Sequence, residues 1–331
     1  MTRKLFETTL LGTGAAALMG LLCQPALAAE TDYPQRPVHL VIGFAAGGGT
    51  DVFVRLLAPY LSKELGQPVV VENPTGANGN LATEAVASAT PDGHTLLIST
   101  NSVMGSGPHV YPDQPVDPIE DLAHVTMLVE SPYYVIASKD SHWSSFDDLV
   151  TAAKADPGKL VFGSQGVGSM GDIVAGVLEL ETGIDLNIVQ YRGGGAVATD
   201  ILSNQAQVTN FSSQMMDSYY ASGQVDGLLV MSPDRNGATP DIPSAGELGY
   251  QDLSRLSYWT GLHAPKDTPP EVIEKLHHAV ADALADPDLA ARIKATGQTP
   301  VASNPDAFEG RVRQDHQFYG DILTRIGFQP E

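Results

Sequence analysis

Residues 38–51 read VHLVIGFAAGGGTD. The segment begins as a β-branched, apolar run, continues into three glycines, and is followed by apolar side chains at helical spacing from Val52 to Leu61. This order predicts a strand, a glycine loop and a helix. Thr50 or Asp51 is a suitable N-cap residue for the predicted helix.

The predicted helix start has the properties of an anion-binding site. Its first backbone N–H groups lack helical partners and carry a partial positive charge. Gly49 stands where a Walker A loop requires lysine, and the glycines do not meet the dinucleotide fingerprint, so a small carboxylate is the favoured anion. A tight turn without a ligand is the alternative that the loop alone leaves open. The candidate residues are Phe44, Ala45, Ala46, Gly47, Gly48, Gly49, Thr50 and Asp51.

The same alternation of elements continues along the chain. Residues 67–73 and 94–100 are strand-like, and a helical segment begins at Leu81 between them. A β–α–β–α–β order predicts a mostly parallel sheet with helices on its faces. Ligands of such sheets bind beyond the carboxyl ends of the strands. The loops 74–80 and 101–107 therefore add Asn78 and Ser102 to the candidates.

The N-terminus and the composition limit the class of protein. Residues 1–28 have Arg3-Lys4, an apolar segment and an A-x-A site at 26–28, which predicts a signal peptide cleaved near Ala28 and a periplasmic protein. The single cysteine, Cys23, precedes this cut, so we expect neither a disulfide nor a cysteine metal site. A formal charge of −21 on 331 residues argues against nucleic acid and anionic membranes as partners. No metal or cofactor is predicted.

A second lobe is expected in the middle of the chain. Two strand-like runs, residues 125–129 and 133–138 with Pro132 between them, lead into it, and residues 256–264 lead back. This assigns residues 29–127 and 259–331 to lobe 1 and 128–258 to lobe 2. Residues 160–172 repeat the strand and glycine loop of the opening segment. Two such helix starts could clamp the two ends of a diacid. The candidates here are the loop residues Ser164, Gly168 and Ser169, with Arg192 and Gly193 at a third glycine-fronted helix.

Arg192 has two interpretations. Its guanidinium could pair with a ligand carboxylate, or it could be a surface arginine or one braced by a carboxylate between the lobes. The tail is expected to be helical over 270–284, 289–296 and 305–326, with Val272, Leu276, Val280 and Leu284 packed against lobe 1.

Several motifs in matching order resemble the Bug family, the periplasmic substrate-binding proteins of tripartite tricarboxylate transporters. They are Tyr33-Pro34-x-Arg36-Pro37, the segment 47–51 (GGGTD), the segment 65–73 (LGQPVVVEN), the segment 91–97 (PDGHTLL) and Tyr191-Arg192-Gly193. The resemblance implies a two-lobed α/β clamshell of the type II periplasmic-binding-protein kind, each lobe a mostly parallel sheet flanked by helices. It also implies a monomer that is not an enzyme, that captures a small organic carboxylate and that delivers it to membrane permease subunits.

The chain departs from the family pattern at positions that bear on the ligand. Members often have Phe-Asp-Asn where this chain has Asn210-Phe211-Ser212, and a histidine where it has Asp172. Phe211 offers an apolar face and no counter-charge for an ammonium group. We expect a carboxylate ligand without a free amino group, with an apolar or aromatic body, bound in part by Phe211 and Ser212. The alternative is that Phe211 packs beneath the cleft.

Two other functions remain as alternatives. An exported serine hydrolase would use Ser164 with His94 or His263, although Phe162 stands where the G-x-S-x-G elbow requires glycine. A receptor that reports its ligand to a sensor protein would keep the same site and differ only in its partner.

Overall fold

The structure is a computed structural model that describes residues 33–76 and 79–330. The predicted signal peptide, Cys23 and Asn78 lie outside the described residues. From Tyr33 onward the chain belongs to one unit by its internal contacts. Within the described part, no helix combines the length and apolar character needed to cross a membrane.

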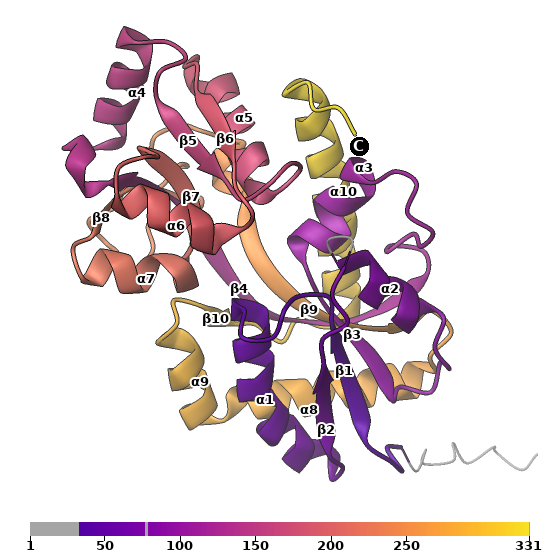
Figure 1. Cartoon of the computed structure of the whole chain (residues 1–331). Helices are drawn as coiled ribbons and strands as arrows, with labels where there is room; N and C mark the ends of the chain where they lie inside the picture. The colour runs from indigo at the N-terminus through magenta and orange to yellow at the C-terminus, as the bar shows by residue number, and fades with distance from the viewer. Residues whose placement is uncertain (1–32, 77–78, 331) are drawn as a thin grey trace, which may run out of the picture. The chain divides into compact units, whose positions relative to one another are not determined.

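One long strand, β4 (Leu122–Ser138), joins two sheets (Figure 1). It pairs with β9 from Leu122 to Pro132 in sheet A, and with β7 and β8 from Tyr133 onward in sheet B. We call sheet A and its helices half A, and sheet B and its helices half B. The other strands of half A are β1 (Val38–Ile42), β2 (Val69–Glu72), β3 (Thr95–Thr100), β9 (Ser257–Pro265) and β10 (Thr299–Pro300). Those of half B are β5 (Val161–Ser164), β6 (Asn187–Gln190), β7 (Val208–Ser212) and β8 (Val225–Met231).

Helices cover both faces of sheet A. The parallel strands β2, β1 and β3 lie in this spatial order, and β9 runs antiparallel beside β3. Apolar side chains of α1 (Gly49–Leu65) and α8 (Pro270–Ala285) fill the core on one face, including the expected Val272, Leu276, Val280 and Leu284. The opposite face packs against α2 (Asn80–Ala87) and the first half of α10 (Pro305–Arg325). A short helix, α9 (Pro287–Lys294), follows α8.

Sheet B is covered in the same way. Because side chains alternate along a strand, β4 sends Val135 and Ala137 into one core and Tyr134 and Ile136 into another. The first core holds α4 (Phe146–Ala155) and α5 (Met170–Thr182). The second holds α6 (Gly194–Leu202) and α7 (Ser213–Ala221).

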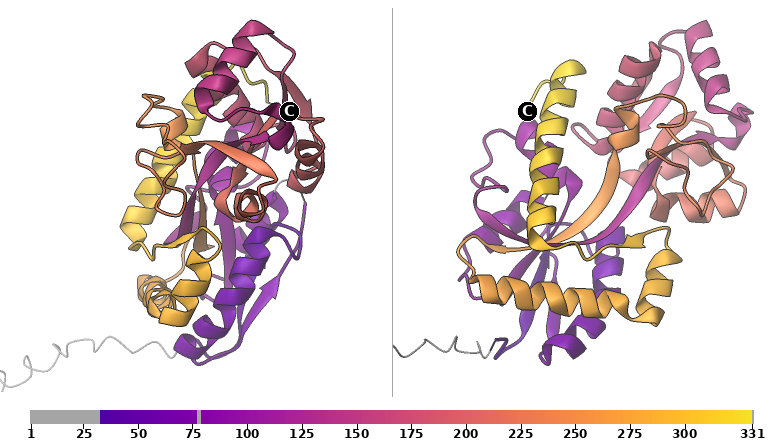
Figure 2. Two further views of the ribbon diagram at one scale, coloured as in Figure 1. Left: turned by 90° about the vertical axis from the view of Figure 1, so that its left-hand side faces the viewer. Right: turned by 180° about the vertical axis from the view of Figure 1, so that it is seen from behind.

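Helix α10 belongs to both halves (Figure 2). Its Phe308 and Val312 are buried in a core of half A, whereas Phe318 and Ile322 are buried in the core of half B. Arg325 near its end forms a 2.7 Å ion pair with Asp252. The halves are therefore connected by α10 as well as by β4 and β9. The lobe limits at 127/128 and 258/259 stay a prediction.

The structure corrects three sequence expectations. Residues 125–129 and 133–138 form a single strand, because Pro132 can lie within the ladder opposite Ser257. The expected loop 101–107 is a π-helical turn, Ser102–Ser106, followed by α3 (Gly107–Val110). Helix α7 and strand β10 were not expected; β10 is only two residues long, and its pairing with β4 is tertiary information.

Gly261 allows a test of the packing between β9 and α10. A Cβ atom at Gly261 would lie 2.1 Å from the ring of Phe308, which is fully buried and cannot move aside. We expect Gly261→Ala to lower the free energy of unfolding by about 1–3 kcal/mol. The control is Gly310→Ala in α10, where open space surrounds the Cβ position and alanine should raise stability by up to about 1 kcal/mol. Urea unfolding measures both, and equal effects would contradict this packing.

Candidate functional site

A tight glycine turn precedes α1, as the sequence predicts. Gly47 has φ +82°, a conformation that favours glycine, and the amide of Gly48 donates to the carbonyl oxygen of Ala45 at 3.2 Å. The N-cap residue is Gly48, not Thr50 or Asp51. The expectation was wrong because Asp51 acts from inside the helix, where its side chain reaches back to the turn.

Asp51 holds this turn together. Its carboxylate accepts hydrogen bonds from the amide of Gly47 at 2.8 Å, from Arg55 Nε at 2.9 Å and from Asn73 Nδ2 at 3.0 Å. Asn73 Nδ2 also donates to the carbonyl oxygen of Phe44 at 3.0 Å. The Arg55 hydrogen bond, followed by those from Gly47 and Asn73, lowers the pKa of Asp51 although burial opposes the shift. The carboxylate is therefore fully engaged in building the turn and is not available to a ligand.

The turn leaves donors free on its outer side. Residues 45–49 are exposed, and nothing in 33–76 or 79–330 accepts a hydrogen bond from the amides of Gly49 and Thr50. The Thr50 hydroxyl is 3.0 Å from the Tyr258 hydroxyl, which also accepts from Thr260 Oγ1 at 3.0 Å. No local sequence pattern marks Tyr258 as a site residue, because only the pairing of distant segments brings it to α1.

The turn before α5 repeats this geometry. Gly168 has φ +67°, the amide of Ser169 donates to Gly166 O at 3.0 Å, and the amide of Gly168 donates to Asp172 Oδ2 at 2.9 Å. Asp172 also accepts from Gln190 Nε2 at 2.6 Å. The two turns share the pattern Gly, N-cap, two residues, Asp.

The α5 turn is less open than the α1 turn. Gly168 is buried, and a Cβ atom there would lie 2.4 Å from Val110 of α3. The Ser164 hydroxyl is buried and lies 3.1 Å from the Ser169 hydroxyl. These side chains therefore support the turn more than they present donors outward.

The start of α6 is open. Gly193 has φ +97° and is the N-cap, and no atom lies near the Cβ positions of Gly193 and Gly195. Arg192 is exposed and forms no ion pair or hydrogen bond with any described residue. The sequence left open that Arg192 pairs with a carboxylate between the lobes. The described residues form no such ion pair. A free guanidinium stands beside free helix amides.

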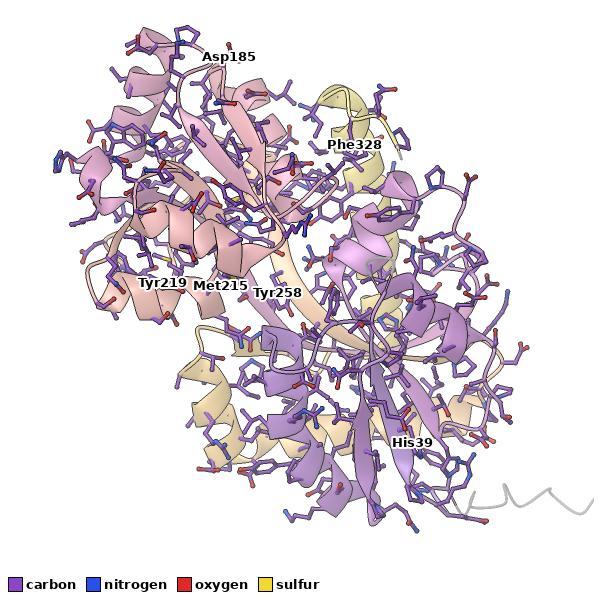
Figure 3. All side chains as sticks on the ribbon, viewed as in Figure 1. His39, Asp185, Met215, Tyr219, Tyr258 and Phe328 are labelled. Atoms are coloured by element: carbon purple, nitrogen blue, oxygen red, sulfur yellow. The ribbon has the colours of Figure 1, made fainter. Side chains whose placement is uncertain are left out.

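The first turn of α7 contacts the N-terminal ends of both α1 and α6. Gln214 Nε2 donates to the carbonyl oxygen of Gly49 at 3.4 Å, and the next residue, Met215, contacts the Cβ position of Gly194 at 2.9 Å. The N-terminal ends of α1 and α6 therefore lie on either side of α7 (Figure 1). Figure 3 labels Met215 and Tyr258 in the part of the molecule where the two halves meet. Gln214 and Met215 were missed because α7 was not expected.

Three other predicted site residues are buried, half-buried or engaged in local contacts. Phe211 is 1% exposed and packs in the core of half B near Tyr219, so the alternative of packing beneath the site is what the structure shows. Because side chains alternate along a strand, the position of Phe211 in β7 directs its ring into the core. Ser212 is the half-buried N-cap of α7. Ser102 follows β3, and its hydroxyl is 2.9 Å from that of Thr100.

The residues of the hydrolase alternative are not brought together. Ser164 bonds within its own turn, whereas His94 contacts Asp92 at 3.1 Å. His263 is fully buried, 2.6 Å from Ser99 Oγ, and burial holds its pKa well below the usual value. Among the residues that the structure describes, no group of three or more His, Cys, Asp or Glu could hold a metal.

Comparisons with known proteins agree with this architecture. The model of a family described as "Tripartite tricarboxylate transporter family receptor" matches residues 53–328. BugT of Bordetella pertussis is 33% identical over 298 residues, covering 89% of this chain and 90% of that protein. A solved structure of the periplasmic binding protein BugD covers 90% of this chain and 100% of its own, with 30% identity and a TM-score of 0.79.

A third comparison includes a ligand. The structure of Rpa4515 from R. palustris with adipate covers 91% of this chain and 100% of its own, with 26% identity and a TM-score of 0.82. The described fold is thus that of a two-lobed α/β binding protein, as the resemblance implied.

The role of Asp51 predicts a pH-dependent loss of stability. Because the folded protein lowers the pKa of Asp51, the ionised carboxylate stabilises the fold at neutral pH, and this contribution is lost as the pH falls through the folded pKa. We expect Asp51→Asn to cost about 1–3 kcal/mol at neutral pH and progressively less below the usual aspartate pKa. Urea unfolding over a pH series measures this. Glu84→Gln, at an exposed position, is the control, and a penalty for Asp51→Asn that does not change with pH would contradict the account.

Proposed function

Because this chain belongs to the tripartite tricarboxylate transporter receptor family, we propose that it is a periplasmic solute-binding protein that holds a small organic dicarboxylate between α1 and α6. The observation that carries this proposal is that the first turn of α7 contacts the N-terminal ends of both α1 and α6, and that the α6 end adjoins Arg192, which has no partner among the described residues.

The first carboxylate would bind at the α1 turn. The amides of Gly49 and Thr50 have no acceptor among the described residues, so they remain as donors at a helix N-terminus, where the helix dipole adds positive potential. On a chain with net charge −21, such a site has to be built from local backbone groups. The Thr50 and Tyr258 hydroxyls, already linked to each other, are the side-chain donors beside it.

The second carboxylate would bind at α6. Here Gly194 and Gly195 offer amides, and Arg192 offers a planar guanidinium that can bind a carboxylate through two N–H groups. The sequence alone suggested the α5 turn as the partner of α1. We favour α6, because Gly168 is buried against Val110, whereas no atom lies near the Cβ positions of Gly193 and Gly195 at the start of α6. Adipate, the ligand in the R. palustris structure, has the two separated carboxylates that this arrangement requires.

The site favours a ligand without an ammonium group, although no longer because of Phe211. An ammonium needs a carboxylate partner, and the two aspartates of the glycine turns, Asp51 and Asp172, are committed to backbone and side-chain hydrogen bonds. A dicarboxylate has no ammonium group and therefore needs no carboxylate partner in the site.

We further propose that the bound solute is delivered to membrane permease subunits, which is what the family description supports. A sensor protein as the recipient would use the same site. Pull-down of the loaded protein with membranes that contain the permease would support delivery, and capture of a sensor kinase instead would overturn it.

Gly48→Val tests the α1 site. Gly48 has φ −71°, which any residue adopts, and its Cβ position lies 3.2 Å from Ala45 O, so the fold should persist while the methyl groups stand beside the free amides. A ligand at 100 times its dissociation constant stabilises by about 2.7 kcal/mol. We expect adipate to raise the melting temperature of the wild type and of Gly310→Ala, but not of Gly48→Val. An equal rise in all three would refute the α1 site.

Arg192→Gln tests the α6 site separately. Loss of a charged hydrogen bond to the ligand should weaken adipate binding about tenfold or more, as measured by titration calorimetry. Arg36→Gln is the matched control, because Arg36 is an exposed arginine whose partner is Asp92. If the Arg192 variant bound as tightly as the control, α6 would not be the second anchor.

A further inference from the structure

A cavity of about 490 Å3 lies on the other side of the strands that cross between the halves. Its walls come from the crossing strands, from the segment after β8, from the turn Leu253–Arg255 and from α10. Figure 2 (right) shows α10 and the segment after β8 on the face opposite to that of Figure 1. The volume falls within the range of small-molecule sites.

Strand β9 separates this cavity from the dicarboxylate site. Ser257 and Tyr258 are neighbours in β9, so their side chains point to opposite faces. The Tyr258 hydroxyl contacts Thr50 at α1, whereas Ser257 Oγ accepts a hydrogen bond from Arg311 Nη2 at 2.6 Å and lines the cavity. The two places are distinct.

Three arginines line the cavity, and two of them are committed. Arg311 donates to Asp315 Oδ1 at 2.9 Å as well as to Ser257, and Arg235 forms two hydrogen bonds with Glu247 at 2.7 and 2.8 Å. Arg255 differs from them. Its guanidinium carbon lies 4.0 Å from the centre of the Phe318 ring, and no acceptor in the described part of the chain reaches it.

This arrangement makes Arg255 a ready anion receptor. Stacking on Phe318 fixes one face of the guanidinium and leaves its edge, with the N–H donors, free. Asn236 lines the same cavity; its Oδ1 accepts from Ala238 N, and its side chain also interacts with the Tyr134 hydroxyl. The free donor group that the cavity offers a carboxylate from half B is therefore the guanidinium of Arg255.

The acidic residues of the cavity lining require a hydrogen-bond donor on the ligand. Asp234 forms no side-chain hydrogen bond with the residues that the structure describes, and Glu130 has only Arg311, at 3.8 Å. A carboxylate alone would face these two acids, whereas a hydroxyl or ammonium group on the ligand would satisfy them.

We propose that this hinge cavity, lined by Arg255, Asn236, Asp234 and Glu130, is a second binding site for a small carboxylate that also carries a hydroxyl or ammonium group. Its occupant would touch both halves, because Glu130 lies in the part of β4 that pairs in sheet A, whereas Asp234 follows β8 of half B. This site goes beyond the proposed function and does not depend on it.

Trp259 provides a direct reporter. Its indole Nε1–H donates to Asp315 Oδ2 at 2.6 Å, and Asp315 lines the cavity. The chain has two tryptophans, so Trp143→Phe assigns the Trp259 indole signal in a 15N–1H spectrum. Serine and malate are the probes, acetate is the probe without a second polar group, and Gly48→Val serves as the background with the α1 site blocked.

We expect serine or malate to shift the Trp259 signal saturably in the wild type and in Gly48→Val, with acetate binding at least tenfold more weakly. Arg255→Gln should weaken the response about tenfold or more, and Asn236→Ala should weaken it less. Arg36→Gln is the matched control, because Arg36 is an exposed arginine that lines neither proposed site, and it should respond like the wild type. No saturable shift with either probe, an undiminished shift in Arg255→Gln, or acetate binding as tightly as the probes would overturn the proposal. A loss of the shift in Gly48→Val would also overturn it.

Discussion

The hydrogen bonds of Asp51 are the constraint on which the candidate site depends. By accepting from Gly47, Arg55 and Asn73, this carboxylate fixes the glycine turn before α1 and links it to the end of β2. The turn is then held rigid from the inside, while the amides of Gly49 and Thr50 have no acceptor among the described residues. A preorganised donor pair loses little freedom when a ligand binds, which is how a strongly acidic protein can hold an anion. Asp172 fixes the α5 turn in the same way.

The two halves are arranged around this turn by long elements. Strand β4 pairs in both sheets, β9 returns beside it, and α10 contributes to the cores of both halves. One side of these connections carries Tyr258 and the meeting of α1, α6 and α7, and the other carries the hinge cavity. Any change in the angle between the halves acts on both sides, so ligands on the two sides would be thermodynamically linked.

Local sequence signals predicted the parallel α/β fold, the strands and the glycine turns, because hydrophobic periodicity and glycine act within a few residues. These local signals failed where contacts between distant segments determine the structure. The N-cap was misassigned because an aspartate can cap from N3 as well as from the N-cap position. Phe211 was placed at the ligand, yet the parity of β7 buries its ring. The serines at 212 and 213 start α7, and without this helix Gln214 and Met215 could not be placed. Tyr258 and the hinge cavity combine residues from distant segments, which no local pattern reveals.

The proposed function requires the helix starts of α1 and α6 to hold the two ends of one solute. Titration of the 15N-labelled protein with adipate, followed through the backbone amide signals, measures whether both take part. We expect saturable shifts, with one dissociation constant, at the amides of Gly49 and Thr50 and at those of Gly194 and Gly195. Saturation that moves signals elsewhere in the protein and leaves these four amides unchanged would contradict it.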